Sequence, residues 1–139
     1  MILFFDDEKR WVRNHIAELE RRELPLTVCS TFESAIEQIT SLGVQIRCAI
    51  LDIMAPSNQP ERTDGGLITG LLVYQTLRNK QPTCPVYFLT NLPDDARVRA
   101  VAKNDPLVAV RPKDKANYDE LADEVEKAYR AQFKGRPHE

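Results

Sequence analysis

Short apolar runs alternate along the chain with longer segments whose apolar residues recur at helical spacing. The short runs occupy residues 2–5, 26–29, 48–53, 86–89 and 107–110. Apolar residues recur at helical spacing in residues 9–21, the segment from Ser30 to Gly43, residues 66–79, the segment from Pro93 to Pro106, and residues 117–133. Proline removes a backbone donor and fixes φ, and the prolines of this chain fall between these segments. The pattern therefore predicts five strands that alternate with five helices.

The second predicted helix begins with a capping motif. Ser30 and Glu33 have the spacing of a capping box, in which the first side chain bonds the backbone amide three residues on and the second bonds back. We therefore predict that Ser30 caps this helix and that Gly43 ends it.

Regular alternation of strand and helix implies right-handed crossovers and a parallel sheet with helices on both faces. The expected fold is α/β, a flavodoxin-like (βα)5 three-layer sandwich whose five strands lie in the order 2-1-3-4-5. We expect one domain over residues 1–134 and a frayed tail at 135–139. Ligands of such a sheet bind outside the carboxyl ends of the first and third strands, where the strand order reverses.

Composition narrows the function classes. The 139 residues include 19 Lys and Arg against 21 Asp and Glu, a net charge of −2, which gives no bulk attraction to nucleic acid or anionic lipid. No apolar run has the length of a membrane span, so neither nucleic acid nor a membrane is expected as a partner. Cys29, Cys48 and Cys84 lie in apolar stretches at wide spacing, which favours buried reduced thiols and a cytoplasmic location.

Carboxylates follow the two strands that flank the expected ligand crevice. Asp6 and Asp7 come directly after the run 2–5, and Asp52 lies near the end of the run 48–53. Carboxylates this close together repel one another unless they bind a hard cation, and Mg²⁺ prefers such oxygen ligands and shares itself with phosphate. The sequence therefore predicts a Mg²⁺-assisted phosphoryl site with Asp52 as the nucleophile.

The two remaining strand ends carry groups that suit phosphoryl oxygens. Thr90 follows the run 86–89 and offers a hydroxyl. Arg111 and Lys113, on either side of Pro112, follow the run 107–110 and offer cations.

These residues, in this order, resemble the receiver domains of bacterial two-component response regulators. The motifs are FFDDE at 4–8, LDIM at 51–54, FLTN at 88–91 and the basic–Pro pair at 111–112. The resemblance implies that Asp52 accepts a phosphoryl group and that Asp6 and Asp7 bind Mg²⁺ together with Asp52 and the carbonyl of Met54. It also implies that Thr90 is the switch hydroxyl.

The resemblance also implies partners. A histidine kinase or a phosphotransfer protein would supply the phosphoryl group, and a downstream protein would read the change at the fourth helix, fifth strand and fifth helix. Catalysis would be limited to self-phosphorylation and autodephosphorylation at Asp52.

Three positions depart from the family pattern. The family places lysine before the proline, where Arg111 stands here with Lys113 one step beyond; register favours Arg111 for that role. Asn91 replaces a small residue, and Val108 replaces an aromatic one. These departures leave a second interpretation open, a degenerate receiver that binds partners without phosphorylation.

One further function, of a different class, is left open. A haloacid-dehalogenase-type phosphatase also uses an aspartyl phosphate and Mg²⁺, but its Asp-x-Asp signature would need aspartate where Glu8 stands. The polar loop 55–65 is either a partner-specific element or a tolerated insertion. The helix 66–79 is apolar on more than one side, which core packing mostly explains. The remaining apolar surface would contact either another protein or a second copy of the chain in a homodimer.

Overall fold

The computed structural model describes residues 1–6, 13–53, 65–90, 96–112 and 118–132. The strands are β1 (Ile2–Phe5), β2 (Leu26–Cys29), β3 (Cys48–Ile53), β4 (Val86–Thr90) and β5 (Val108–Pro112). The helices are α1 (Arg13–Arg21), α2 (Phe32–Leu42), α3 (Gly65–Lys80), α4 (Ala96–Asn104) and α5 (Tyr118–Ala131), with a 3-10 turn η2 (Gly43–Gln45) after α2. All strand pairs are parallel and the order is β2-β1-β3-β4-β5. The predicted fold is confirmed; the predicted tail lies outside the described residues.

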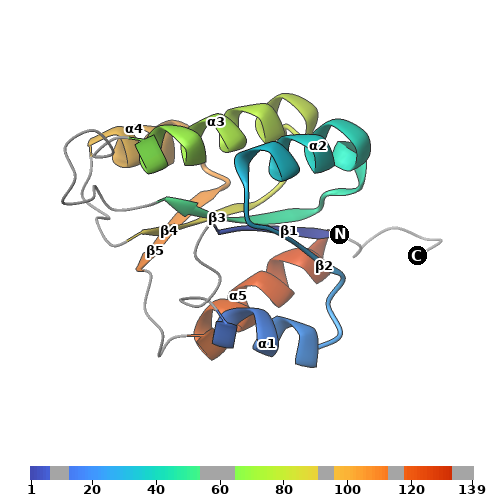
Figure 1. Ribbon diagram of the computed structural model, residues 1–139. Helices are drawn as coiled ribbons and strands as arrows, with labels where there is room; N and C mark the ends of the chain where they lie inside the picture. The colour runs from blue at the N-terminus through green and yellow to red at the C-terminus, as the bar shows by residue number, and fades with distance from the viewer. Residues whose placement is uncertain (7–12, 54–64, 91–95, 113–117, 133–139) are drawn as a thin grey trace.

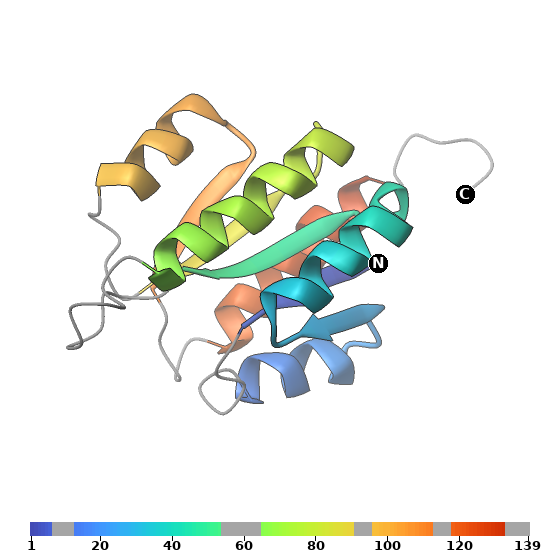
Figure 2. The same ribbon diagram turned by 45° about the horizontal axis from the view of Figure 1, so that its top comes forward.

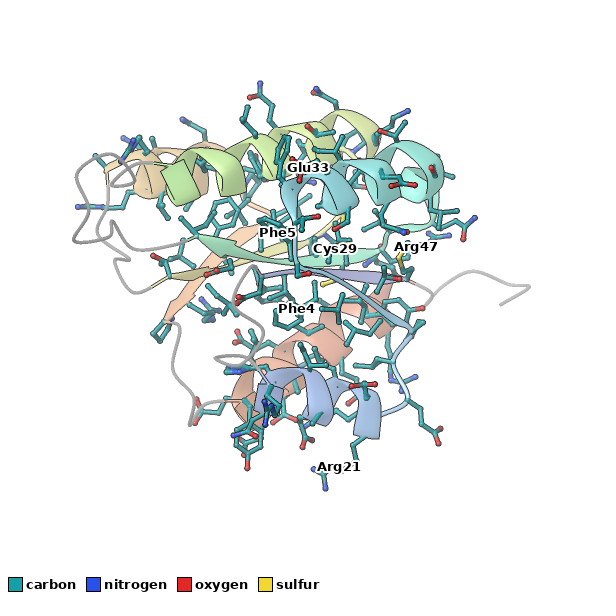
Figure 3. The ribbon with its side chains drawn as sticks, viewed as in Figure 1. Phe4, Phe5, Arg21, Cys29, Glu33 and Arg47 are labelled. Carbon is teal, nitrogen blue, oxygen red and sulfur yellow. The ribbon has the colours of Figure 1, made fainter. Side chains whose placement is uncertain are left out.

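The sheet lies between two layers of helices. Figure 1 shows α2, α3 and α4 on one face and α1 and α5 on the other, and Figure 2 shows the first three side by side across the sheet. Successive strand side chains point to opposite faces, as Phe4 and Phe5 do in Figure 3, and each belongs to a separate hydrophobic core. Strand β3 is buried at every position because helices cover both of its faces.

The cap of α2 lies one residue later than predicted. Thr31 has an extended backbone, and its hydroxyl accepts a hydrogen bond from the Ser34 amide at 3.1 Å. The Ser34 hydroxyl accepts in turn from the Thr31 amide, so it replaces the expected Glu33 carboxylate. The prediction of Ser30 was wrong because two adjacent hydroxyl residues offer the same cap in two registers.

The fifth strand also differs from its prediction. It begins at Val108, one residue late, and extends through Pro112 because Arg111 and Pro112 continue the pairing with β4. Leu107 lies outside the strand and is 38% exposed. Its amide donates to the Asp105 carboxylate at 3.0 Å, which fixes a turn directly after α4.

An ion-pair network joins α1 to α5. Glu18 is 5% exposed and accepts hydrogen bonds from Arg21 at 2.6 Å and Arg22 at 2.8 Å. Arg22 also reaches Asp123 at 2.6 Å and Glu126 at 3.2 Å, both on α5. Because hydrogen bonds from Arg21 and Arg22 favour its charged form, the pKa of Glu18 is lowered. The sequence pattern places Glu18 on a polar face and gives no sign of this burial.

Asp105 holds the end of α4 against α3. Its carboxylate accepts from the Tyr74 hydroxyl at 2.6 Å and from Arg78 Nε at 2.9 Å. Burial alone would raise the pKa of Asp105, but these hydrogen bonds and that of the Leu107 amide outweigh it, so the pKa is lowered. The fourth helix is therefore tied to the third at its carboxyl end.

The burial of the cysteines and the lengths of the described helices agree with what the composition predicted. Cys29, Cys48 and Cys84 are buried thiols, as predicted, and burial raises the pKa of Cys84 to about 12. Among the helices that the structure describes, none has both the length and the apolar character needed to cross a membrane.

Gly70 lets α3 approach the end of β3 closely. A Cβ atom at this position would lie 2.6 Å from Ile53 Cδ1 and 3.0 Å from the Asp52 carbonyl oxygen. The second of these atoms belongs to the backbone and has no rotamer through which to move away. Gly70 therefore sets the separation between α3 and the strand residue that the sequence singles out as a nucleophile.

We predict that Gly70→Ala lowers the free energy of unfolding by about 1 kcal/mol. Alanine gains about 1 kcal/mol in helix propensity, but overpacking against a fixed backbone costs about 1–3 kcal/mol. Urea denaturation measures the difference, with Asn79→Ala at an exposed position of the same helix as the control. A Gly70→Ala protein as stable as the Asn79→Ala protein would contradict this steric account.

Candidate functional site

Two buried carboxylates end adjacent strands. Asp6 directly follows β1 and is 0% exposed, and Asp52 lies near the end of β3 and is 2% exposed. Strands β1 and β3 pair Phe5 with Leu51, so the next residue of each strand brings Asp6 and Asp52 side by side. Burying a carboxylate is costly unless cations or hydrogen-bond donors compensate it. This edge of the sheet is therefore suited to a cation or a cation-bound anion.

Both carboxylates face the layer of α1 and α5. Phe4 and Ile50 belong to the core under these helices, and Asp6 and Asp52 follow them at the two-residue period of a strand. The amide of Asp6 donates to the Cys29 carbonyl at 3.0 Å, which aligns this position with the end of β2.

Arg111 lies in the same row of the sheet. Asp52 pairs with Leu89 on β4, and Leu89 pairs with Arg111 on β5. Asp6, Asp52 and Arg111 therefore lie in one line across the carboxyl edge, as the sequence predicted from their places at strand ends. Leu89 separates Asp52 from Arg111.

Thr90 lies beside this row rather than in it. It is the last residue of β4, is 1% exposed, and pairs with Ile53 and Pro112. Because Val86 and Phe88 belong to the core under α2, α3 and α4, alternation directs Thr90 toward that face. Thr90 therefore lies at the carboxyl end of the sheet, one residue after Leu89.

The guanidinium of Arg111 is bound to Glu124 of α5. Its Nε donates to both carboxylate oxygens at 3.1 and 2.9 Å, and Nη2 donates to Oε1 at 2.6 Å. Nη1 donates to the Val110 carbonyl at 2.9 Å. The Tyr87 hydroxyl donates to the backbone carbonyl of Glu124 at 3.3 Å. Side chains of β4 and β5 thus hold the middle of α5.

This pair shifts the titration of both partners. The hydrogen bonds from Arg111 lower the pKa of Glu124, and those same bonds raise the pKa of Arg111. Both side chains are 38% exposed, so water screens the attraction. Burial raises the pKa of Tyr87 to about 12.

Three predicted site residues lie outside the described part of the chain: Asp7, Met54 and Lys113. The same holds for Asn91 and for most of the 55–65 loop. Within the described ranges, His, Cys, Asp and Glu side chains form no group of three that would hold a metal ion. The donors that are described, Asp6 and Asp52, are hard oxygen ligands on adjacent strands, which fits Mg²⁺ as it usually binds, through one or two carboxylates.

Sequence reasoning missed Glu124. Its only signal in the sequence is its place on α5, three residues after the inward-facing Leu121, at the rim of the buried stripe. Acidic residues are common at such positions on solvent-exposed helices. The presence of Glu124 there therefore does not predict that it pairs with Arg111.

Val108 fills the position where the resemblance expects an aromatic residue. It is 9% exposed and packs in the core under α2, α3 and α4. In that layer the ring of Tyr74 of α3 meets the ring of Phe88 edge to face, with the ring centroids 5.4 Å apart.

Solved receiver domains are similar to this chain over most of its length. A CheY-like response regulator receiver domain protein from Methanospirillum hungatei JF-1 is 16% identical, with a TM-score of 0.69 over 96% of this chain and 95% of that chain. A receiver domain of a Francisella response regulator is 20% identical, with a TM-score of 0.68 over 94% and 97%. The chain has the receiver fold.

A third similar structure was solved with ligands. It is the response regulator protein TrrA from Thermotoga maritima in complex with Mg²⁺-BeF, 23% identical, with a TM-score of 0.62 over 91% of this chain and 96% of that chain. No protein-family model and no curated protein matches the chain. At the level of the fold, the resemblance to receivers is confirmed.

We predict that Arg111→Gln raises the pKa of Glu124 toward its ordinary value. Because the pKa of Glu124 is lowered in the folded state, the pair stabilises the protein at pH values above about 4.3, the pKa of glutamate in an unfolded chain. This stabilisation is lost as the pH falls through the lowered folded-state pKa. Carboxyl ¹³C NMR titration measures the pKa, with Glu126, bound to Arg22 and Arg130, as the internal reference. Equal Glu124 titrations in the two proteins would contradict the pairing.

Proposed function

We propose that the protein is a response-regulator receiver that accepts a phosphoryl group on Asp52 and signals through altered protein contacts. The observation that carries the proposal is the pair of buried carboxylates, Asp6 and Asp52, at the ends of β1 and β3 of a receiver fold. That edge is where a doubly wound sheet binds its ligand. Arg111, in the same row, supports a role for an anion there.

The proposed reaction is one phosphoryl transfer. A carboxylate oxygen of Asp52 forms the new O–P bond while the P–N bond to the donor's histidine breaks. The electron pair of that bond stays on the imidazole nitrogen, which takes up a proton from water. Thr90 and a cationic side chain would then hydrogen-bond the phosphoryl oxygens. A small acyl phosphate serves as donor by the same displacement, with the acylate leaving.

Asp6, Asp7, Asp52 and the Met54 carbonyl would hold Mg²⁺ in this proposal. Bound there, the ion would offset the negative charge that gathers as a phosphoryl group nears the carboxylates. Support comes from the hard oxygen donors of Asp6 and Asp52, and from the Thermotoga maritima receiver solved with Mg²⁺-BeF.

The proposed donor is a histidine kinase or a phosphotransfer protein. A receiver domain from the hybrid histidine kinase CckA has the same fold at 20% identity, which supports this class of partner. The downstream protein would contact α4, β5 and α5, where Arg99 and Lys103 are exposed. A second copy of the chain remains the alternative contact, because Leu72 of α3 is 47% exposed.

We predict one Mg²⁺-dependent phosphoryl adduct after incubation with acetyl phosphate, measured by intact-mass spectrometry. Asp52→Asn removes the nucleophile and should abolish the adduct. Asp119→Asn makes the same change at an exposed carboxylate of α5 and should retain it. An adduct that persists in Asp52→Asn would refute the assignment. Absence of an adduct in every protein, with both acetyl phosphate and a phosphorylated phosphotransfer protein, would favour the phosphorylation-independent binding module instead.

We predict that Arg111, rather than Lys113, contacts the phosphoryl group. Arg111→Gln should slow adduct formation by about tenfold or more, because a lost donor to a developing charge has an effect of at least that order. Lys113→Gln should slow it less. The reverse order, measured from the time course of the same adduct, would assign the contact to Lys113.

A further inference from the structure

Glu124 binds the guanidinium of Arg111, the cation that the proposed phosphoryl site needs. Every side-chain hydrogen bond described for Arg111 goes to the Glu124 carboxylate or to the Val110 carbonyl. The carboxylate is bound by two guanidinium nitrogens, the bidentate geometry that arginine also offers to a phosphoryl group. A phosphoryl group at Asp52 and Glu124 would therefore compete for the same donors.

The sheet places Arg111 within reach of both anions. Asp52, Leu89 and Arg111 lie in register on three neighbouring strands, so the Cα atoms of the outer two are roughly 10 Å apart, two strand spacings. An extended arginine side chain spans most of that separation, and a phosphoryl group on Asp52 would extend toward it. The guanidinium is now bound to Glu124, in the middle of α5.

The present pairing is weak enough to be exchanged. Both side chains are 38% exposed, and exposed ion pairs contribute little because water screens them. A carboxylate carries one negative charge, whereas a phosphoryl group carries close to two at neutral pH and has three acceptor oxygens. In an edge with two buried carboxylates, the phosphoryl group is the stronger competitor for a guanidinium.

We propose that Arg111 exchanges partners, leaving Glu124 for the phosphoryl group when Asp52 is modified, so that Glu124 is a positioning residue that links the site to α5. This inference rests on the proposed function and adds regulation of the same site. In the unmodified state Glu124 keeps Arg111 away from Asp52 and fastens α5 to β5. In the modified state α5 loses that side-chain contact and keeps the Tyr87 hydrogen bond to its backbone.

Two consequences follow from the exchange. Removing the charge of Glu124 should strengthen binding of a phosphoryl mimic, because the mimic no longer displaces a carboxylate. The gain should vanish when Arg111 is absent, because Glu124 acts only through Arg111. A merely structural role for the pair would produce neither effect.

The experiment is a titration with beryllofluoride in the presence of Mg²⁺, followed by amide NMR. It compares wild type, Glu124→Gln, Arg111→Gln and the double variant. Glu126→Gln is the matched control, since it removes the same charge from the same helix but contacts Arg22 and Arg130 instead. The Arg111 Nε–H resonance is followed in the same samples.

We expect Glu124→Gln to lower the beryllofluoride concentration at half-saturation by roughly two- to fivefold, the range of an exposed ion pair. Glu126→Gln should leave it unchanged, and Glu124→Gln should have no effect in the Arg111→Gln background. In wild type the Arg111 Nε–H resonance should shift on saturation.

Two outcomes would overturn the inference for different reasons. If wild type binds beryllofluoride but Glu124→Gln has the same midpoint and the Arg111 resonance does not move, the exchange is wrong while the proposed function stands. If wild type shows no response at any concentration, the proposed function fails, and the exchange fails with it.

Discussion

The parallel pairing of β1 with β3 determines where the candidate site of this protein lies. The two strands run in register from Ile2 with Cys48 to Phe5 with Leu51, and each continues into an aspartate. Apolar residues fill both faces of the pair, so a slip by one residue would exchange side chains between the two hydrophobic cores and disrupt the packing of both. Asp6 and Asp52 are therefore held together in a buried position, although two carboxylates repel each other there.

Two anionic positions lie within reach of Arg111: the Glu124 carboxylate, and the row of the sheet that contains Asp52. Arg111 is aligned with Asp52 through Leu89, yet its guanidinium is bound to Glu124. Arg22 of the loop after α1 also binds α5, through Asp123 and Glu126. Helix α5 is thus held by the Arg111–Glu124 pair, which involves a residue in the row of the candidate site, and by two ion pairs with Arg22, which do not. A change in charge at Asp52 would act on the first and leave the second in place.

Much of the fold and part of the site were predictable from the sequence. Short apolar runs located β1, β2 and β3 to the residue, and the same pattern placed Asp6, Asp52, Thr90 and Arg111 at strand ends. Patterns of this kind report burial and local turns. They do not report partners made by tertiary packing, which is why the burial of Glu18 and the pairing of Arg111 with Glu124 were missed. The cap at Thr31 was misplaced because neighbouring hydroxyl residues are equivalent in sequence terms.

In the proposed reaction Asp52 receives a phosphoryl group and Arg111 leaves Glu124 to bind it. A crystal structure grown with Mg²⁺ and beryllofluoride tests both parts at once. We expect beryllofluoride on a carboxylate oxygen of Asp52, with the Arg111 guanidinium bound to fluoride and released from Glu124. A structure in which Asp52 carries no beryllofluoride, or in which Arg111 stays on Glu124 beside an occupied site, would contradict it.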